Sequence, residues 1–171
     1  MSVGVFFPVS LKKPDEQDAA GMWSLVKNIP NLDLNSLYSY LMLCSHFRDT
    51  CVVAKMDDEV VGFVTAFVSP EDPSTLFIWQ LAVHPKSRKT GLATQMVQEL
   101  LQRPDTESVR YVEATVTPSN NPSSGFFKNI ADLYQSPCDV REKFPPHLFG
   151  DTHHERELLY RIGPVPSLAQ R

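Results

Sequence analysis

Residues 76–93 have the sequence Leu76-Phe77-Ile78-Trp79-Gln80-Leu81-Ala82-Val83-His84-Pro85-Lys86-Ser87-Arg88-Lys89-Thr90-Gly91-Leu92-Ala93. The stretch from Leu76 to Val83 is almost entirely apolar, which predicts a central strand buried on both faces. His84-Pro85 ends this strand, because the residue before a proline avoids helix and the proline donates no ladder hydrogen bond. From Gly91 to Gln102, apolar residues recur at helical spacing. The segment is therefore predicted to be a strand, a short turn and an amphipathic helix.

Patterns on either side of this segment predict the other elements. Before it we expect a strand over 9–13, a helix over 15–27 capped by Asp15, a helix over 35–47, and a hairpin of strands 51–55 and 60–68. After it we expect a strand over 109–117, a helix after Pro118, a loop over 136–150 and a strand over 157–162. The order β-α-α-β-β-β-α-β-α-β predicts a mixed α/β fold (α+β) with a mostly antiparallel central sheet flanked by helices.

Length and composition limit the number of domains and the classes of partner that the chain can have. A chain of 171 residues suits a single domain over residues 1–171, with an ordered core over about 9–164 and a flexible tail over 165–171. The net charge of -4 is unfavourable for a nucleic-acid binder, and no apolar run approaches the ~20 residues that cross a bilayer. The N-terminus does not resemble a signal peptide, and the scattered Cys44, Cys51 and Cys138 form no disulfide framework. These features predict a cytoplasmic protein with no membrane partner.

The turn before the predicted helix has the features of a phosphate-binding site. A helix N-terminus presents free backbone N–H groups and a partial positive charge. Gly91 has no Cβ, so a phosphate can approach the backbone closely, and Arg88 and Lys89 can add positive charge. The alternative is a solvent-facing turn with incidental basic residues.

Leu81-Ala82-Val83-His84-Pro85 followed by Arg88-x-x-Gly91-x-Ala93 resembles the acetyl-CoA signature of the GNAT N-acetyltransferase superfamily. The resemblance implies acetyl-CoA as co-substrate, a pyrophosphate held by backbone amides of Arg88, Lys89, Thr90, Gly91, Leu92 and Ala93, and a pantetheine arm along Leu81, Ala82 and Val83. It further implies an oxyanion-stabilising N–H at Leu81 and a cofactor contact at Asn120. Lys89 departs from the pattern, since many members have a second glycine there.

More distant motifs narrow the resemblance to the diaminobutyrate acetyltransferases. These motifs are Leu32-Asp33-Leu34-Asn35-Ser36, Leu43-Cys44-x-His46-Phe47, Gly62-Phe63-Val64-Thr65-Ala66, Phe77-x-Trp79-Gln80, Thr115-Val116-Thr117-Pro118-Ser119-Asn120 and His154-Glu155-x-Glu157 with Tyr160-Arg161-Ile162-Gly163-Pro164. The resemblance spans about residues 10–164. It implies acetylation of the γ-amine of L-2,4-diaminobutyrate in ectoine synthesis, and a homodimer.

The reaction requires a neutral amine, an oxyanion donor and a proton for the leaving thiolate. An alkyl ammonium has a pKa near that of lysine, about 10.4, so a base or a water relay must deprotonate it. In this superfamily a tyrosine usually acts as the general acid that protonates the leaving thiolate. The resemblance places Phe127 at that position, and phenylalanine has no proton to give, so Tyr38 or solvent must protonate the thiolate instead. Besides Leu81 and Tyr38, the catalytic candidates are His154 and Glu155.

The candidate ligands of a substrate with two ammonium groups and a carboxylate are Asp33, Asn35, Tyr38, Trp79, Glu113, Thr115, His154 and Glu155. Each has a purely structural alternative. Asp33 and Asn35 are also suited to capping a helix, Glu113 and Thr115 to the solvent face of an edge strand, Trp79 to the core, and residues 153–155 to a solvated turn. No metal site is expected, because the ligand types at His153-His154-Glu155 are consecutive and do not converge on one ion.

Cys44 is expected to be a small core residue, so acetyl transfer is predicted to be direct. The sequence is also consistent with two alternative functions. One is acetylation of another small diamine or amino acid, and the other is a non-catalytic acyl-CoA-binding domain.

Overall fold

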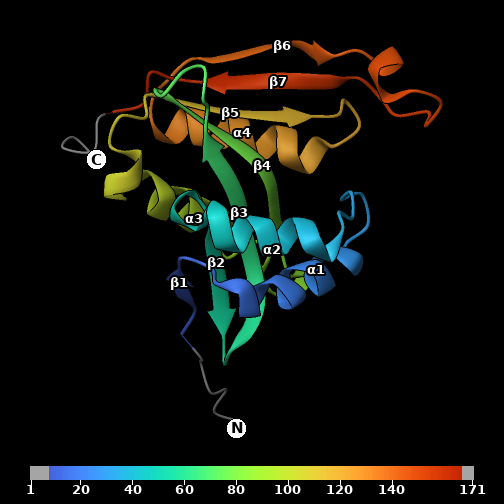
Figure 1. Ribbon diagram of the computed structural model, residues 1–171. Helices are drawn as coiled ribbons and strands as arrows, with labels where there is room; N and C mark the ends of the chain where they lie inside the picture. The colour runs from blue at the N-terminus through green and yellow to red at the C-terminus, as the bar shows by residue number, and fades with distance from the viewer. Residues whose placement is uncertain (1–7, 167–171) are drawn as a thin grey trace, which may run out of the picture. The chain divides into compact units, whose positions relative to one another are not determined.

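The computed structural model describes residues 8–166. Its helices in this range are α1 (Ala19–Lys27), α2 (Leu37–His46), α3 (Leu92–Leu101) and α4 (Asn121–Leu133). Its strands are β1 (Ser10–Lys12), β2 (Val52–Met56), β3 (Glu59–Val68), β4 (Thr75–Val83), β5 (Tyr111–Val116), β6 (Cys138–Phe144) and β7 (Glu157–Ile162). The strands form one sheet in the order β1-β2-β3-β4-β5-β7-β6 (Figure 1).

Strand pairing is mostly antiparallel. The pairs β1–β2, β2–β3, β5–β7 and β6–β7 are antiparallel. β4 and β5 are parallel, with the register running from Thr75 opposite Tyr111 to Ile78 opposite Ala114. The predicted mixed fold class is confirmed, with one strand more than the predicted order contains.

The described chain divides into two compact units. The first comprises residues 8–65 and 80–100, and the second comprises residues 66–79 and 101–166. β3 and β4 each contribute residues to both units. A single domain over residues 1–171 remains a prediction.

In the first unit, the β2–β3 hairpin turns at Asp57 and Asp58, both of which have positive φ. Aspartate tolerates this conformation better than most residues, so the acidic pair suits a tight hairpin. Successive residues of β3 face opposite sides. A Cβ on Gly62 would lie 3.2 Å from Met96 of α3, whereas Phe63 belongs to the core formed with α1. β3 is therefore covered by helices on both faces.

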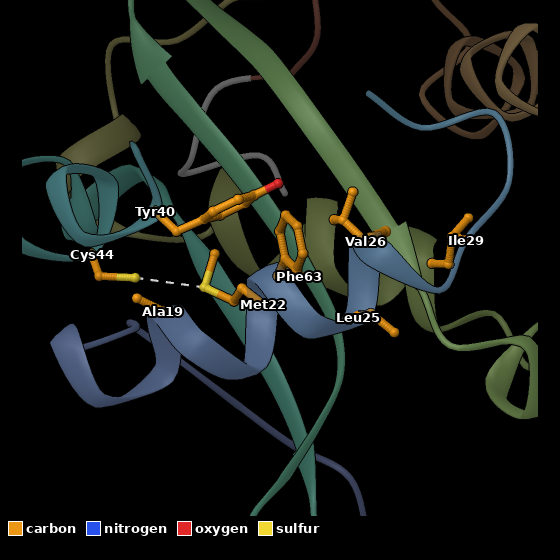
Figure 2. Packing of buried hydrophobic residues seen from close by; sticks show 9 residues of the cluster. Ala19, Met22, Leu25, Val26, Ile29, Tyr40, Cys44 and Phe63 are labelled. Carbon is orange, nitrogen blue, oxygen red and sulfur yellow. Dashed lines mark hydrogen bonds between the residues drawn. The ribbon is translucent and has the colours of Figure 1, made fainter. Parts of the chain in front are cut away.

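The core between α1, α2 and β3 is shown in Figure 2. It consists of Ala19, Met22, Leu25, Val26, Ile29, Tyr40, Cys44, Phe63 and Ala82. The Tyr40 and Phe63 rings meet edge to face, with centroids 5.9 Å apart. The predicted helix start at Asp15 is confirmed, because Asp15 forms a capping box with Asp18. Cys44 is completely buried, as predicted, and its sulfur lies 3.5 Å from that of Met22.

The second unit is built on β5, β7 and β6 (Figure 1). The predicted alternation of β5 is confirmed, since Val112, Ala114 and Val116 are buried and the residues between them are partly exposed. On α4, Phe127 is buried and its ring centroid lies 6.3 Å from that of Tyr160 on β7. Helix α4 therefore packs on β7.

Two local predictions are wrong. Residues 136–150 were predicted to be a loop, but they contain β6 and the 3-10 helix Pro146–Phe149. β6 lies at the end of the sheet, and all of its side chains except partly buried Cys138 are exposed, so no burial pattern marks it. β4 is not buried on both faces, because Trp79 is 46% exposed and Phe77, Leu81 and Val83 are only partly buried.

The predicted tail over 165–171 falls largely on residues 167–171, which lie outside the described range. Val165 itself is buried, and its N–H donates to the Arg110 carbonyl at 2.7 Å. Among the helices of residues 8–166, none is both long enough and apolar enough to span a membrane.

Candidate active site

The predicted phosphate loop connects β4 to α3 in the first unit. After Val83 the chain forms the 3-10 helix Pro85–Ser87, whose N-terminal His84 ring accepts a hydrogen bond from the Lys86 N–H at 3.2 Å. The Thr90 hydroxyl donates to the Ser87 carbonyl at 2.7 Å and so closes the loop. These local bonds fix the approach of the chain to α3.

Two residues of the loop have left-handed backbone conformations. Lys89 has a φ of 61° and Gly91 a φ of 82°. Position 89 is where the resemblance expects a second glycine, and Lys89 adopts the conformation that favours one. A Cβ on Gly91 would have the Gln95 side chain at 4.0 Å as its nearest neighbour, so the space above this residue is open. The backbone here is accessible to a ligand.

The first turn of α3 supplies the donors that an anion requires. Its first backbone bond runs from the Gln95 N–H to the Gly91 carbonyl at 3.0 Å. Helix geometry leaves the N–H groups before Gln95 without acceptors inside the helix, and the helix dipole favours negative charge there. Arg88, Lys89 and Thr90 are exposed around this turn, while Leu92 anchors it in the core. The arrangement fits a pyrophosphate.

Another group of predicted residues lies before α2. Asp33 and Tyr38 are exposed, Tyr38 at 69%, and Asn35 is partly buried. Neither Asp33 nor Asn35 caps the helix, because the Ser36 hydroxyl accepts the Ser39 N–H at 3.3 Å. Their capping alternative is therefore wrong, and Asp33 and Asn35 remain candidate ligands.

This segment is attached to β4 through Gln80. The Nε2 group of Gln80 donates to the Asp33 carbonyl at 2.9 Å, and the Tyr40 hydroxyl donates to Oε1 of Gln80 at 2.8 Å. Gln80 directly precedes Leu81, the predicted oxyanion donor. The structure therefore connects Asp33 to the strand that carries Leu81.

In the second unit, the predicted residues Asn120 and Glu155 lie at the start of α4. The Asn120 side chain accepts the Ser123 N–H at 3.2 Å and caps the helix. The neighbouring Ser119 hydroxyl donates to the Glu155 carboxylate. Two motifs that are distant in the sequence are thus brought together.

The side chain of His154, next to Glu155 in the sequence, is contacted by three neighbouring groups. Its ring stacks on Phe149 with centroids 4.0 Å apart, and Nδ1 lies 2.6 Å from the Glu155 carbonyl. Its Nε2 lies 3.7 Å from the Glu157 carboxylate. These contacts hold the imidazole in one place.

Glu113 is engaged in an ion pair. Its carboxylate accepts from the Arg161 guanidinium at 2.5 Å, so its charge is compensated inside the protein. Thr115, two residues further along β5, is partly exposed, and Trp79 of β4 is exposed. Both keep side-chain surface available for a ligand, whereas Glu113 does not offer an uncompensated charge.

Two chemical groups are unsuited to catalysis. Burial raises the pKa of the Cys44 thiol to about 12, so it stays protonated and is a poor nucleophile. Phe127 stands where the resemblance expects a tyrosine that acts as the general acid, and its ring packs between those of Phe126 and Tyr160. Among residues 8–166, no group of three or more His, Cys, Asp or Glu side chains is arranged to hold a metal ion.

Comparison with known proteins gives the family. The model of the Acetyltransferase (GNAT) family matches residues 17–131 of the chain. The chain belongs to this family. The loop before α3 thus lies inside the matched region.

Curated relatives in this GNAT family are named L-2,4-diaminobutyric acid acetyltransferase. The enzyme of Marinococcus halophilus is 51% identical over 152 residues, which cover 89% of this chain and 88% of the relative. That of Halomonas elongata is 44% identical over 158 residues, covering 92% and 82% respectively.

A solved structure is similar over nearly the whole chain. It is the diaminobutyrate acetyltransferase EctA from Paenibacillus lautus in complex with its substrate L-2,4-diaminobutyric acid and coenzyme A. It has a TM-score of 0.89 and 38% identity, and covers 93% of this chain and 96% of its own. Ard1 from Thermoplasma volcanium, at 15% identity and a TM-score of 0.72 over 91% of this chain and 97% of its own, shares the fold.

Sequence reasoning missed several residues that organise the site. Gln80 appeared only as part of a motif, and Tyr40 only as part of the predicted helix over 35–47. Their hydrogen bond joins positions 40 residues apart, so no local pattern reveals it. Arg161 belongs to a quoted motif, but its pairing with Glu113 depends on the register of β5 and β7. Ser119 was adjacent to a predicted residue, but its bond to Glu155 depends on a contact 36 residues away.

Proposed function

We infer that the chain is an acetyl-CoA-dependent N-acetyltransferase that acetylates L-2,4-diaminobutyrate at its γ-amine and serves ectoine synthesis. The observation that carries this inference is the similarity, over 93% of the chain, to an enzyme solved with diaminobutyric acid and coenzyme A. The loop before α3 agrees with it, since its open glycine and helix N-terminus suit a pyrophosphate.

Residues of the first unit are proposed to bind acetyl-CoA and the substrate and to polarise the acetyl carbonyl. Backbone N–H groups of residues 88–93 hold the pyrophosphate, and the strand edge at residues 81–83 pairs with the pantetheine arm. The Leu81 N–H stabilises the oxyanion that forms on the acetyl carbonyl. Asp33 accepts a substrate ammonium, with Asn35 and Tyr38 as polar partners. When bound, acetyl-CoA supplies the acetyl group as an activated thioester.

Residues of the second unit are proposed to assist binding and proton transfer. Asn120 contacts the cofactor, and Trp79 and Thr115 contact the substrate. Glu155 and His154 are the proposed groups for moving the proton from the ammonium, directly or through water. Glu113 is given no substrate role because Arg161 compensates its charge. The neutral amine then attacks the thioester directly, without an acyl-cysteine, because the Cys44 thiol is buried and protonated.

Steady-state kinetics test this proposal. Initial rates of thiol release from acetyl-CoA are measured with diaminobutyrate, diaminopropionate, ornithine and lysine, and the product is assigned by NMR. We expect the highest kcat/KM with diaminobutyrate and acetylation at the γ-nitrogen. A higher kcat/KM with another amine would assign the chain to that substrate.

The same assay separates catalysis from cofactor binding alone. Phe127 is the observation that favours a non-catalytic acyl-CoA-binding role, because it lacks the hydroxyl of the usual acid. Binding of coenzyme A without amine-dependent thiol release would establish that role instead. We expect amine-dependent release, with the thiolate protonated by Tyr38 or by solvent.

We also propose that the protein acts in the cytoplasm as a homodimer. The absence of a disulfide at Cys44, Cys51 and Cys138 supports a reducing compartment, and resemblance to diaminobutyrate acetyltransferases supports the dimer. Cell fractionation and light scattering coupled to gel filtration test these two points. Export of the protein, or a monomeric mass at micromolar concentration, would overturn the respective point.

A further inference from the structure

Gln80 is a buried polar residue in a strand where apolar side chains predominate. Only 9% of its surface is exposed. A buried amide costs free energy unless its donor and acceptor groups are hydrogen-bonded. Here Oε1 accepts from the Tyr40 hydroxyl at 2.8 Å and Nε2 donates to the Asp33 carbonyl at 2.9 Å. Both ends of the amide are therefore used.

The partners determine how the amide is oriented. The Asp33 carbonyl can only accept, so the NH₂ group of Gln80 must face it. Oε1 must then face Tyr40, and the Tyr40 hydroxyl must donate. If the Gln80 amide were turned by 180°, its oxygen would face the Asp33 carbonyl oxygen and no hydrogen bond could form there. The hydrogen bonds thus run in one direction, from Tyr40 through Gln80 to Asp33.

Tyr40 is held firmly at the other end of this chain of bonds. It is 1% exposed and packs edge to face on Phe63 in the core between α1, α2 and β3 (Figure 2). Burial raises the pKa of the Tyr40 phenol, while hydrogen bonding with Asn35 and Gln80 lowers it. The hydroxyl consequently keeps its proton across the neutral range and remains a donor.

Residues 33–35 lie outside the helices and strands, and Ser36 joins them to α2, since its carbonyl and hydroxyl both accept from the Ser39 N–H. The bond from Gln80 joins their backbone to β4, whose next residue is Leu81. The place of this segment bears on catalysis, because a misplacement of about 1 Å near a reacting group can cost about 100-fold in rate.

We propose that Gln80 is a positioning residue: its buried amide, oriented by Tyr40, holds the segment from Asp33 to Asn35 at a fixed place relative to Leu81 and so aligns the amine with the oxyanion-stabilising N–H. This inference rests on the proposed function, in which Asp33 and Asn35 bind the amine. A structural role alone would lower stability without a selective effect on the amine.

The decisive variant is Gln80→Glu, which keeps an acceptor for Tyr40 but loses the donor for Asp33 at high pH. The carboxylate faces a carbonyl oxygen in a buried place, and both effects raise its pKa. Below that pKa the protonated carboxyl can donate to the Asp33 carbonyl again. The defect of this variant should therefore diminish as the pH falls.

The measurement is the KM for diaminobutyrate relative to wild type at each pH, which cancels the titration of the substrate itself. At about pH 9 we expect the KM of Gln80→Glu to exceed that of wild type about tenfold, falling to about threefold near pH 6. The KM for acetyl-CoA should stay within about twofold of wild type throughout. Gln80→Met, similar in size but without donor or acceptor, should show a KM ratio that does not change with pH.

A KM ratio of Gln80→Glu that is independent of pH, or an equal rise in the KM for acetyl-CoA, would overturn the inference. Tyr40→Phe provides a second arm should Gln80→Glu fail to fold, since it removes a single hydroxyl. We expect it to raise the KM for diaminobutyrate about threefold, and an unchanged KM would count against us. Thr65→Val is the matched control: its hydroxyl bonds the Gln80 backbone carbonyl at 3.4 Å, and its loss should leave the KM within about twofold.

Failure of the proposed function is distinguishable from failure of this inference. Should wild type prefer another amine, the same variants are measured with that amine. The pH-dependent KM ratio would then still identify Gln80 as a positioning residue. A flat ratio with diaminobutyrate as the preferred amine would reject the inference and leave the proposed function intact.

Discussion

The guanidinium of Arg161 donates to the carboxylate of Glu113 at 2.5 Å and lies 3.9 Å above the Tyr111 ring. The same guanidinium donates to the Thr75 hydroxyl at 3.1 Å. Residues of three strands, β4, β5 and β7, are therefore connected within the second unit by one side chain. A planar guanidinium suits this arrangement because it can form several directed hydrogen bonds while stacking on an aromatic face.

Arg161→Met should destabilise the protein by about 1–3 kcal/mol, because it leaves the partly buried Glu113 carboxylate without its partner. Urea unfolding monitored by circular dichroism measures this loss. Arg161→Lys retains the charge but not the planar fork, so we expect an intermediate loss. A change in the Arg161→Met free energy of unfolding smaller than the experimental error would show that the ion pair contributes nothing.

Asp72 should make unfolding sensitive to acid. Hydrogen bonds from Ser74 and Thr75, together with a smaller contribution from the charge of Arg161, lower the pKa of its carboxyl to about 2. The unfolded value is about 3.9, so the contribution is complete above pH 4 and is lost as the pH falls towards about 2. Asp72→Asn should accordingly flatten the dependence of the unfolding free energy on pH in that window. An identical pH slope in the two proteins would refute this assignment.

Gly91→Ala should weaken binding of coenzyme A. A Cβ at this position has room within the protein, but a φ of 82° is strained for alanine and the new methyl group occupies the approach to the backbone. We expect the Kd for coenzyme A to rise about tenfold, measured by isothermal titration calorimetry. Lys89→Gly tests backbone strain separately, since it removes a side chain at a φ of 61° and should change the free energy of unfolding by less than about 1 kcal/mol.

These residues show how far sequence reasoning extends. The β4–α3 loop was predictable because a glycine and a strong helical pattern are local signals. The strand β6 was not, because a sheet-edge strand with exposed charged side chains has no buried face to create alternation. Capping of α2 was an open alternative for Asp33 and Asn35, but Ser36 provides the cap, and the sequence could not decide because all three residue types are good caps. The role of Glu113 depended on Arg161, whose proximity only the β5–β7 register reveals.

Asp33→Asn and Glu113→Gln should have opposite signatures. The Asp33 side chain is exposed beside the segment held by Gln80, and loss of its charge should raise the KM for diaminobutyrate about tenfold or more. Glu113→Gln weakens the ion pair to Arg161, so it should lower the free energy of unfolding while the KM stays within about twofold. Kinetics and urea unfolding of both variants test this contrast. A KM effect confined to Glu113→Gln would reverse the assignment of the two carboxylates.

Cys44 should be dispensable for acetyl transfer and unreactive in the folded protein. Burial raises the pKa of its thiol to about 12, so almost no thiolate exists near neutral pH, and its side chain is completely buried. Iodoacetamide should therefore modify partly exposed Cys138 first and reach Cys44 and Cys51 only on unfolding. Cys44→Ala should retain kcat within about twofold while losing about 1–2 kcal/mol of stability through the small cavity it creates. A kcat reduced by orders of magnitude in a folded Cys44→Ala protein would instead indicate an acyl-cysteine intermediate and rule out direct attack of the amine.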